Sequence, residues 1–223
     1  MGTNNGPVGQ GLENLVIRVD MADDLSYSGA GNTIQSVMKN QALSSSSIGY
    51  TAVGRGERAL VFSGAGFVTS VNNTGVSGTQ SRTLSCWVKF GSKASQGVLA
   101  TGVNGSGTGM AIATTSTVFL LAQGNSGTLT TTTYNQNLWY HVNYVSEFVT
   151  GTTHRIKLYV NGGLAHTAVV SGINLTNASL RIGMDMSGFG MSGQIARVNF
   201  YDKALSDKEI FKSYVNYKSR FGL

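Results

Sequence analysis

Two acidic side chains near the C-terminus have a spacing that could support catalysis. Asp207 and Glu209 lie two residues apart, and a retaining glycosidase uses two carboxyl groups about 5–5.5 Å apart. On a β-strand, residues two apart share one face of the sheet. These two residues fall in a predicted helix, however, where positions i and i+2 point in different directions. We therefore interpret them as charges that stabilise the helix N-terminus, and the sequence predicts no enzyme.

A second acidic cluster, formed by Asp20, Asp23 and Asp24, could bind a metal ion. Calcium sites are built from several oxygen ligands, and a loop with these three aspartates could supply some of them. The alternative is a solvated polar loop that binds no ion. Calcium is the one cofactor that the sequence suggests, with these three residues as candidate ligands.

The other reactive side chains lack the spacing of known sites. Neither an H-E-x-x-H nor a G-x-S-x-G motif occurs. The single cysteine, Cys86, excludes an internal disulfide and a zinc site of several thiolates, and we expect it in the core. A G-x-G-x-x-G pattern at Gly188, Gly190 and Gly193 precedes a predicted strand rather than the helix of a dinucleotide site. Structural roles are expected for the three histidines, His141, His154 and His166.

The elements that must position these residues are predicted to be short β-strands. Charged residues make up 12% of the chain, against about 25% in an average domain, and glycine is abundant. Short apolar segments recur between turn residues, and several alternate with a period of two. The sequence therefore predicts an all-β fold, an antiparallel two-sheet jelly-roll sandwich. The predicted strands are 15–19, 59–62, 84–90, 98–103, 110–113, 118–122, 139–145, 156–160, 180–184 and 195–201.

Two local patterns refine this prediction. Asn161, Gly162 and Gly163 lie between two strand-like segments, and an Asn-Gly turn is a strong hairpin signal. Strict alternation is lost after Ile195, so we expect a β-bulge near residues 196–197.

One helix is predicted, over about residues 206–218 at the C-terminus. Ser206 and Glu209 have the spacing of a capping box. We expect its apolar residues to pack against the sandwich, and its basic residues to face outward or to contact a partner. The apolar residues are Leu205, Ile210, Phe211, Tyr214 and Val215, and the basic residues, our docking candidates, are Lys212, Lys218 and Arg220.

The predicted domain organisation is simple. Residues 1–13 are rich in turn-forming residues and predict a flexible arm, and residues 14–223 predict one domain. The N-terminus lacks the regions of a secretion signal, and no segment reaches the ~18–20 apolar residues of a membrane span. The formal net charge is +6, but the basic residues are scattered. We therefore expect neither a nucleic-acid nor a membrane partner.

From about residue 14 onward, the order of segments resembles that of concanavalin A-like, laminin G-like jelly-roll domains. The opening LVIRVDMADDLSYSGAGNT resembles the first strand of this family and the turn after it, at Asp20, Ser26, Tyr27, Gly29 and Gly31. The later segments follow in the family's order, and the most specific of them is the last. They are ALVFSGAGFVTS, LSCWVKF with Trp87, LWYHVNYV, IKLYVNGGLAH, LRIGMD and GQIARVNFYDKALSDKEIFKSY.

The two ends of the chain suggest a narrower resemblance. SYSGAGNT near the start and NYKSRFGL at the end are similar to jelly-roll domains in virion proteins of tailed bacteriophages. Three positions depart from the pattern. Ile34 stands where these proteins usually have Trp, Ser63 where Asp commonly precedes Gly, and Phe67 where Tyr is common. The Ser63 departure weakens the case for a cation site that such an Asp would help to build.

This resemblance implies a non-enzymatic virion structural protein, most directly one that decorates the capsid surface of a tailed phage. It would be synthesised in the host cytoplasm and lie on the outer surface of the virion. Its partners would be the major capsid protein or other virion proteins, with several copies or a homo-oligomer on the particle.

The alternative is a glycan-binding adhesin or receptor-binding component of the tail or head, with a host surface glycan as partner. Exposed aromatic side chains would then stack on sugars. The candidates for glycan contact are Tyr134, Tyr140 and Phe189, whereas Trp87 and Trp139 are expected mainly in the core.

Overall fold

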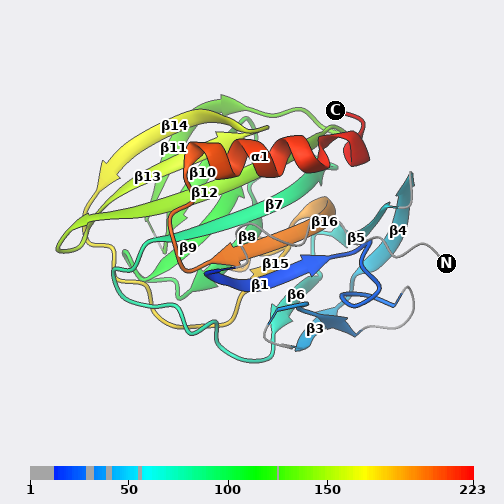
Figure 1. Cartoon of the computed structure of the whole chain (residues 1–223), viewed down its shortest axis with the longest axis horizontal. Coiled ribbons are helices and arrows are strands. Elements are labelled where there is room, and N and C mark those ends of the chain that lie inside the picture. The colour runs from blue at the N-terminus through cyan, green and yellow to red at the C-terminus, as the bar shows by residue number, and fades with distance from the viewer. Residues whose placement is uncertain (1–12, 29–32, 39–41, 55–56, 125) are drawn as a thin grey trace.

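The protein is a sandwich of two antiparallel β-sheets with a helix on one outer face (Figure 1). The computed structural model describes residues 13–28, 33–38, 42–54, 57–124 and 126–223. Most of the predicted arm, and Gly29 and Gly31 of the predicted turn, lie outside these residues. The jelly-roll fold class predicted from the sequence is confirmed.

The first sheet, called sheet I, has the strand order β14-β13-β12-β7-β16-β5-β4, and β1 also pairs with β16. The second, sheet II, has the order β11-β10-β9-β8-β15-β6-β3-β2. The strands of sheet I are β1 (Leu15–Asp20), β4 (Gly49–Gly54), β5 (Glu57–Ser63), β7 (Arg82–Phe90), β12 (Trp139–Thr150), β13 (Thr153–Val160), β14 (Gly163–Val170) and β16 (Ser192–Tyr201). Those of sheet II are β2 (Ile34–Gln35), β3 (Ala42–Ser46), β6 (Phe67–Ser70), β8 (Gln96–Gly102), β9 (Gly109–Thr114), β10 (Val118–Gln123), β11 (Ser126–Thr133) and β15 (Arg181–Ile182).

The local predictions for the strands are confirmed. Each predicted strand overlaps an observed one, and β13 and β14 form the predicted hairpin around Asn161 and Gly162. Both of these residues have positive φ, 50° and 82°, as a tight hairpin turn requires. The pairing of β16 with β7 shifts register between Ile195 and Arg197, where the sequence predicts a bulge.

Alternation along β7 shows how both faces of sheet I become buried. Leu84, Cys86, Val88 and Phe90 belong to the main core between the sheets. Trp87 points the other way but is only 1% exposed, because the C-terminal segment covers it. The core prediction for Trp87 is confirmed, while Trp139 is only partly buried beside it.

The covering segment is helix α1 (Asp207–Tyr217), followed by a 3-10 turn, η1 (Lys218–Phe221). The predicted capping box is present, because the Glu209 N–H donates to Ser206 Oγ and the Ser206 N–H donates to Glu209 Oε2. Within the described residues, no helix is long and apolar enough to cross a membrane.

The predicted packing face of α1 is wrong in part. Leu205 and Ile210 are buried as expected, but Phe211 is 57% exposed and Val215 is 42% exposed. Tyr214 packs against the sheet as expected, and Tyr217 and Phe221, which were not predicted to do so, pack beside it. The reason is the large ring of Trp87: Phe221 stacks on it with centroids 4.2 Å apart, and Tyr214 with centroids 5.9 Å apart. This aromatic contact turns the helix so that Phe211 faces outward.

Candidate functional site

The predicted calcium ligands are bound to arginines instead of lying around one cation site. Asp20 is 3% exposed and accepts hydrogen bonds from Arg197, at 3.0 Å, and from Arg220, at 3.2 Å. Burial alone would raise the pKa of the Asp20 carboxyl, but these arginines outweigh it and hold that pKa below its ordinary value. Asp24 pairs with Arg58 at 3.0 Å.

Asp23 lies 3.8 Å from Arg18 and accepts a hydrogen bond from the Leu25 N–H. Among the described residues, no group of three or more His, Cys, Asp or Glu side chains could hold a metal ion. The calcium prediction is therefore corrected: guanidinium groups already supply the positive charge that Asp20, Asp23 and Asp24 need.

Arg220 is the second correction among the predicted site residues. Its guanidinium pairs with the Glu57 carboxylate as well as with Asp20, and Glu57 is only 4% exposed. The positive charge of Arg220 is thus used to join η1 to β1 and β5, so it does not face a partner. Lys212 is exposed, and the Lys218 Nζ lies over the Tyr214 ring. Docking through these two lysines stays a prediction.

The three candidates for glycan contact differ in exposure. Tyr134 is 1% exposed, and its hydroxyl donates to the Thr115 carbonyl at 2.8 Å, so its prediction as a glycan contact is wrong. Its ring packs against Phe90 in the core, and the hydrogen bond satisfies its hydroxyl. Tyr140 is partly buried against the core, and its hydroxyl accepts from the Asn135 N–H. Phe189 is 55% exposed.

Of the reactive side chains expected to be structural, His141, His154 and Cys86 are buried, and His166 is partly buried. His141 is 1% exposed and stacks on Trp87, and burial lowers its pKa to about 3. His154 bonds to Ser146 Oγ at 2.9 Å, and burial, with Arg82 nearby, lowers its pKa to about 4. Both rings are therefore neutral at physiological pH. Burial raises the pKa of the Cys86 thiol, which keeps it protonated and unreactive.

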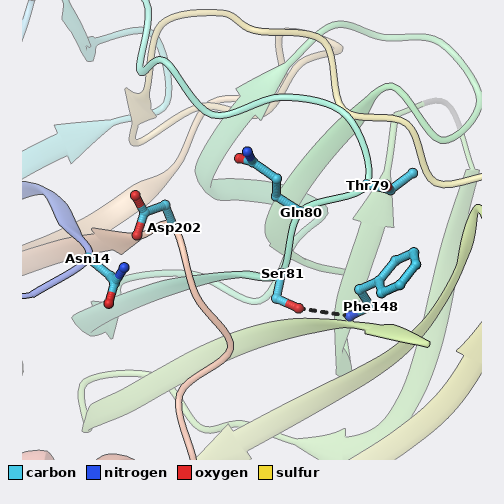
Figure 2. A pocket seen from close by; sticks show the side chains of 6 residues that line it. All are labelled: Asn14, Thr79, Gln80, Ser81, Phe148 and Asp202. Carbon is cyan, nitrogen blue, oxygen red and sulfur yellow. Dashed lines mark hydrogen bonds between the residues drawn. The ribbon is translucent and has the colours of Figure 1, made fainter. Parts of the chain in front are cut away.

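A hollow that we call the end pocket, with a volume of about 500 Å³, lies where four segments meet (Figure 2). It is lined by residues before β1, before β7, at the end of β12 and after β16. The pairing of Leu15 with Tyr201 brings the first and last of these segments together, and the Asp202 N–H donates to the Asn14 carbonyl at 2.9 Å. The lining residues are Asn14, Thr79, Gln80, Ser81, Phe148 and Asp202.

Unused polar groups in the end pocket are suited to binding hydroxyl groups. Asp202 Oδ1 is buried and has no hydrogen-bond donor among the described residues. The amides of Asn14 and Gln80 lie nearby in Figure 2 and can donate and accept. A buried acceptor without a donor is costly, and a turn of the Asp202 carboxylate toward the hollow would let Oδ1 accept from a ligand hydroxyl.

An aromatic surface lies at the other side of the end pocket. Phe148 is 45% exposed, and its N–H donates to Ser81 Oγ at 2.9 Å. One edge of its ring contacts the buried His154, with ring centroids 5.9 Å apart. The ring is therefore held in place while part of its surface stays open to solvent.

The residues of this pocket were not predicted from the sequence. They come from four distant segments and form no motif. The available signal was indirect: Asn14 and Asp202 flank the first and last predicted strands, but only the observed pairing of β1 with β16 places them together.

A second hollow, which we call the face pocket, has a volume of about 470 Å³ and lies on the outer face of sheet II. Arg181 on β15 pairs in register with Thr69 on β6 and with Ala100 on β8. The hydrophobic face of these strands points into the core, so Arg181 and Thr69 face outward into the hollow. Its remaining lining residues are Phe67, Asn73, Gly102, Val103, Ala178, Ser179 and Met184.

Comparison with known proteins agrees with this architecture. A sequence profile of the Laminin_G_3 family, described as the concanavalin A-like lectin/glucanases superfamily, matches residues 62–211. No curated protein matches the sequence significantly.

The fold is similar to solved structures of low sequence identity. Domain 4 of the extracellular arabinanase AbnA from Geobacillus stearothermophilus, solved with arabinotriose, superposes with a TM-score of 0.64 at 16% identity, over 89% of this chain and 97% of that chain. A botulinum neurotoxin type C structure, described as depending on two ganglioside molecules for cell entry, gives 0.64 at 19% identity, over 91% and 51%. The binding domain of Paraclostridial Mosquitocidal Protein 1 gives 0.65 at 15%, over 92% and 52%. The chain thus spans about half the length of the two toxin structures.

Proposed function

Because the chain belongs to the concanavalin A-like lectin/glucanases superfamily, we propose that it is a non-enzymatic protein that binds glycans through the end pocket. The observation that carries the proposal is the unpaired Asp202 Oδ1 in a hollow that also holds two amides and an exposed phenyl ring. A sugar presents hydroxyl groups at its rim and C–H groups on its faces. The pocket offers partners for both, because Asp202 accepts from hydroxyls and Phe148 provides an apolar surface.

Several facts support binding rather than catalysis. The end pocket has one carboxylate, Asp202, whereas glycoside hydrolysis generally uses two. Asp207 and Glu209, the acid pair considered from sequence, have other partners: the Tyr159 hydroxyl donates to Asp207 at 2.5 Å, and Glu209 completes the capping box. The arabinanase domain that this chain resembles was solved with an oligosaccharide.

The experiment is a glycan array with the wild-type protein, followed by calorimetric titration of the best neutral ligand. Replacing Asp202 with Asn should weaken binding about tenfold, because a neutral amide oxygen accepts a weaker hydrogen bond than a carboxylate. Replacing Phe148 with Ala should weaken it about threefold to tenfold through the lost contact with the ring. Phe211→Ala is the matched control, since Phe211 is also an exposed phenylalanine, at 57% against 45% for Phe148, but lies on α1.

Unchanged affinity in both pocket variants would contradict the proposal, as would an array without any glycan bound. A carbohydrate-active enzyme would instead release new reducing ends from the bound glycan, and this is measured on the same ligands.

The setting that we propose is the outer surface of a tailed-phage virion, where the protein decorates the capsid or serves as an adhesin on the head or tail. Its support is the resemblance of the segments SYSGAGNT and NYKSRFGL to phage virion proteins. Capsid proteins and further copies of this chain would be its partners on the particle, and a host surface glycan would be its ligand. Quantitative proteomics of purified particles tests this setting: tens to hundreds of copies are expected for decoration, a handful for a tail adhesin, and none if the setting is wrong.

A further inference from the structure

The face pocket has a positively charged side chain that faces the hollow. Arg181 is partly buried, and its guanidinium donates one hydrogen bond to the Asp185 carbonyl at 3.3 Å. Asp185 Oδ1 accepts from the N–H groups of Ser187 and Phe189, both at 2.9 Å. The loop thus holds Arg181 in place without neutralising its charge.

Arg181 differs in this respect from most other arginines that the structure describes. Arg18, Arg58, Arg155, Arg197 and Arg220 each have a carboxylate within 4 Å. Arg82 has none, but it is 1% exposed and donates to the Gly78 carbonyl. Within the described part of the chain, Arg181 is therefore the one arginine that combines access to solvent with the lack of an acidic partner.

The surroundings of Arg181 suit a small polar ring that carries an acid. Thr69, Asn73 and Ser179 bring hydroxyl and amide groups to the same hollow. Phe67 and Met184, both partly buried, provide apolar surface beside them. A guanidinium binds a carboxylate through two parallel hydrogen bonds, and the neighbouring groups can bind hydroxyls.

We propose that the face pocket is a second binding site, which takes a carboxylate-bearing sugar such as a uronic acid residue. The carboxylate pairs with the Arg181 guanidinium, the sugar hydroxyls bond to Asn73, Thr69 or Ser179, and the ring lies against Phe67. The assignment of a sugar rests on the proposed function, whereas the assignment of an acid rests on Arg181, which has no carboxylate partner.

The test is calorimetric titration of the whole protein with a galacturonic acid trisaccharide, its neutral methyl ester and inorganic sulfate. The acid form should bind about tenfold or more tightly than the ester, and its affinity should fall as salt is added. Arg181→Gln should remove this preference, and Arg181→Lys should keep part of it because the charge remains. Arg155→Gln is the matched control, since Arg155 is exposed on sheet I and pairs with Glu147.

Each outcome decides one point. Equal affinity for acid and ester, or an unchanged preference in a folded Arg181→Gln variant, overturns the inference. Sulfate binding as tight as that of the acidic trisaccharide overturns the sugar assignment and leaves a general anion site. The end pocket is tested separately. If acid binding depends on Arg181 but not on Asp202 or Phe148, and no neutral ligand binds, the proposed end-pocket function is wrong and this inference stands.

Discussion

The outer faces of the two sheets are used in opposite ways. On sheet I, the large side chain of Trp87 is covered by Tyr214 and Phe221, and Asp20 and Glu57 are covered by Arg220. On sheet II, the register places Ala100, Ala111 and Ala122 side by side. In the described part of the chain, a loop with Met186 covers these alanines and no helix does. Large and charged residues close the outer face of sheet I, whereas the outer face of sheet II keeps the face pocket beside its alanines.

This difference distinguishes charged residues that stabilise the fold from those that are available to a ligand. The basic C-terminal segment looks like a docking surface in the sequence, yet its arginine is a structural ion pair. Arg181, in the middle of sheet II, has no such partner and faces a hollow. Whether a charge has a partner, rather than its position near a terminus, decides which residue is available to a ligand.

The largest loss of stability should come from removing the side chain of Trp87, which lies under the C-terminal segment on the outer face of sheet I. Replacing Trp87 with Ala should cost about 3–5 kcal/mol of unfolding free energy, because the side chain is 1% exposed and its loss leaves a cavity. Urea denaturation measures this cost. Leu129→Ala is the control from sheet II: Leu129 is 61% exposed on β11, so its change should stay within about 0.5 kcal/mol. Similar costs for both variants would break the contrast between the two faces.

The ion pairs under η1 should produce the next largest effect. Replacing Arg220 with Gln leaves the buried Glu57 without its positive partner and removes one partner of Asp20. Loss of one member of a buried pair costs about 3–5 kcal/mol, and we expect about 2–4 kcal/mol because the Arg220 side chain is 26% exposed. Lys212→Gln, an exposed lysine on the same segment, should change stability by less than about 0.5 kcal/mol. Equal, small effects would mean that Arg220 is a surface residue after all.

The pH dependence of the same variant sharpens this prediction. The arginines hold the pKa of Asp20 below its ordinary value of 3.8. A carboxyl with a lowered folded-state pKa contributes stability above its unfolded pKa and loses it as the pH falls through the folded value. The stability difference between wild type and Arg220→Gln should therefore be full at pH 6 and shrink below about pH 4. A difference independent of pH would assign the effect to packing.

The fold was largely predictable from sequence because its signals are local. Alternation along 84–90, the Asn161-Gly162 turn and the Ser206–Glu209 capping box each depend on neighbouring residues, and each is found in the structure. The strands β4 and β11 were not predicted, and neither were the short strands β2 and β3, since Ser-rich segments such as Ala42–Ser46 have little apolar periodicity. The pairing of β3 with β6, and of β2 with β3, forms β2 and β3 as strands.

The candidate sites were far less predictable, because they depend on contacts between distant segments. Asp20 and Arg220 are 200 residues apart, and no sequence pattern reveals that they neutralise each other. Tyr134 and Phe189 are both aromatic residues near predicted loops, yet one is buried and the other is exposed. Exposure and pairing are set by tertiary packing, which a single sequence does not encode locally.

The smallest change in unfolding free energy should come from a residue on the outward side of α1. This measurement tests which face of the helix packs against sheet I. Phe211 is 57% exposed, whereas the adjacent Ile210 is fully buried with Val145, Tyr159 and Leu205. Phe211→Ala should change the unfolding free energy by no more than about 0.5 kcal/mol, while Ile210→Ala should cost about 2–5 kcal/mol. Urea denaturation of the two variants, with the same slope required for both, gives the comparison. A cost above about 2 kcal/mol for Phe211→Ala would mean that the helix packs through the face expected from sequence, and that the stack of Tyr214 and Phe221 on Trp87 does not set its orientation.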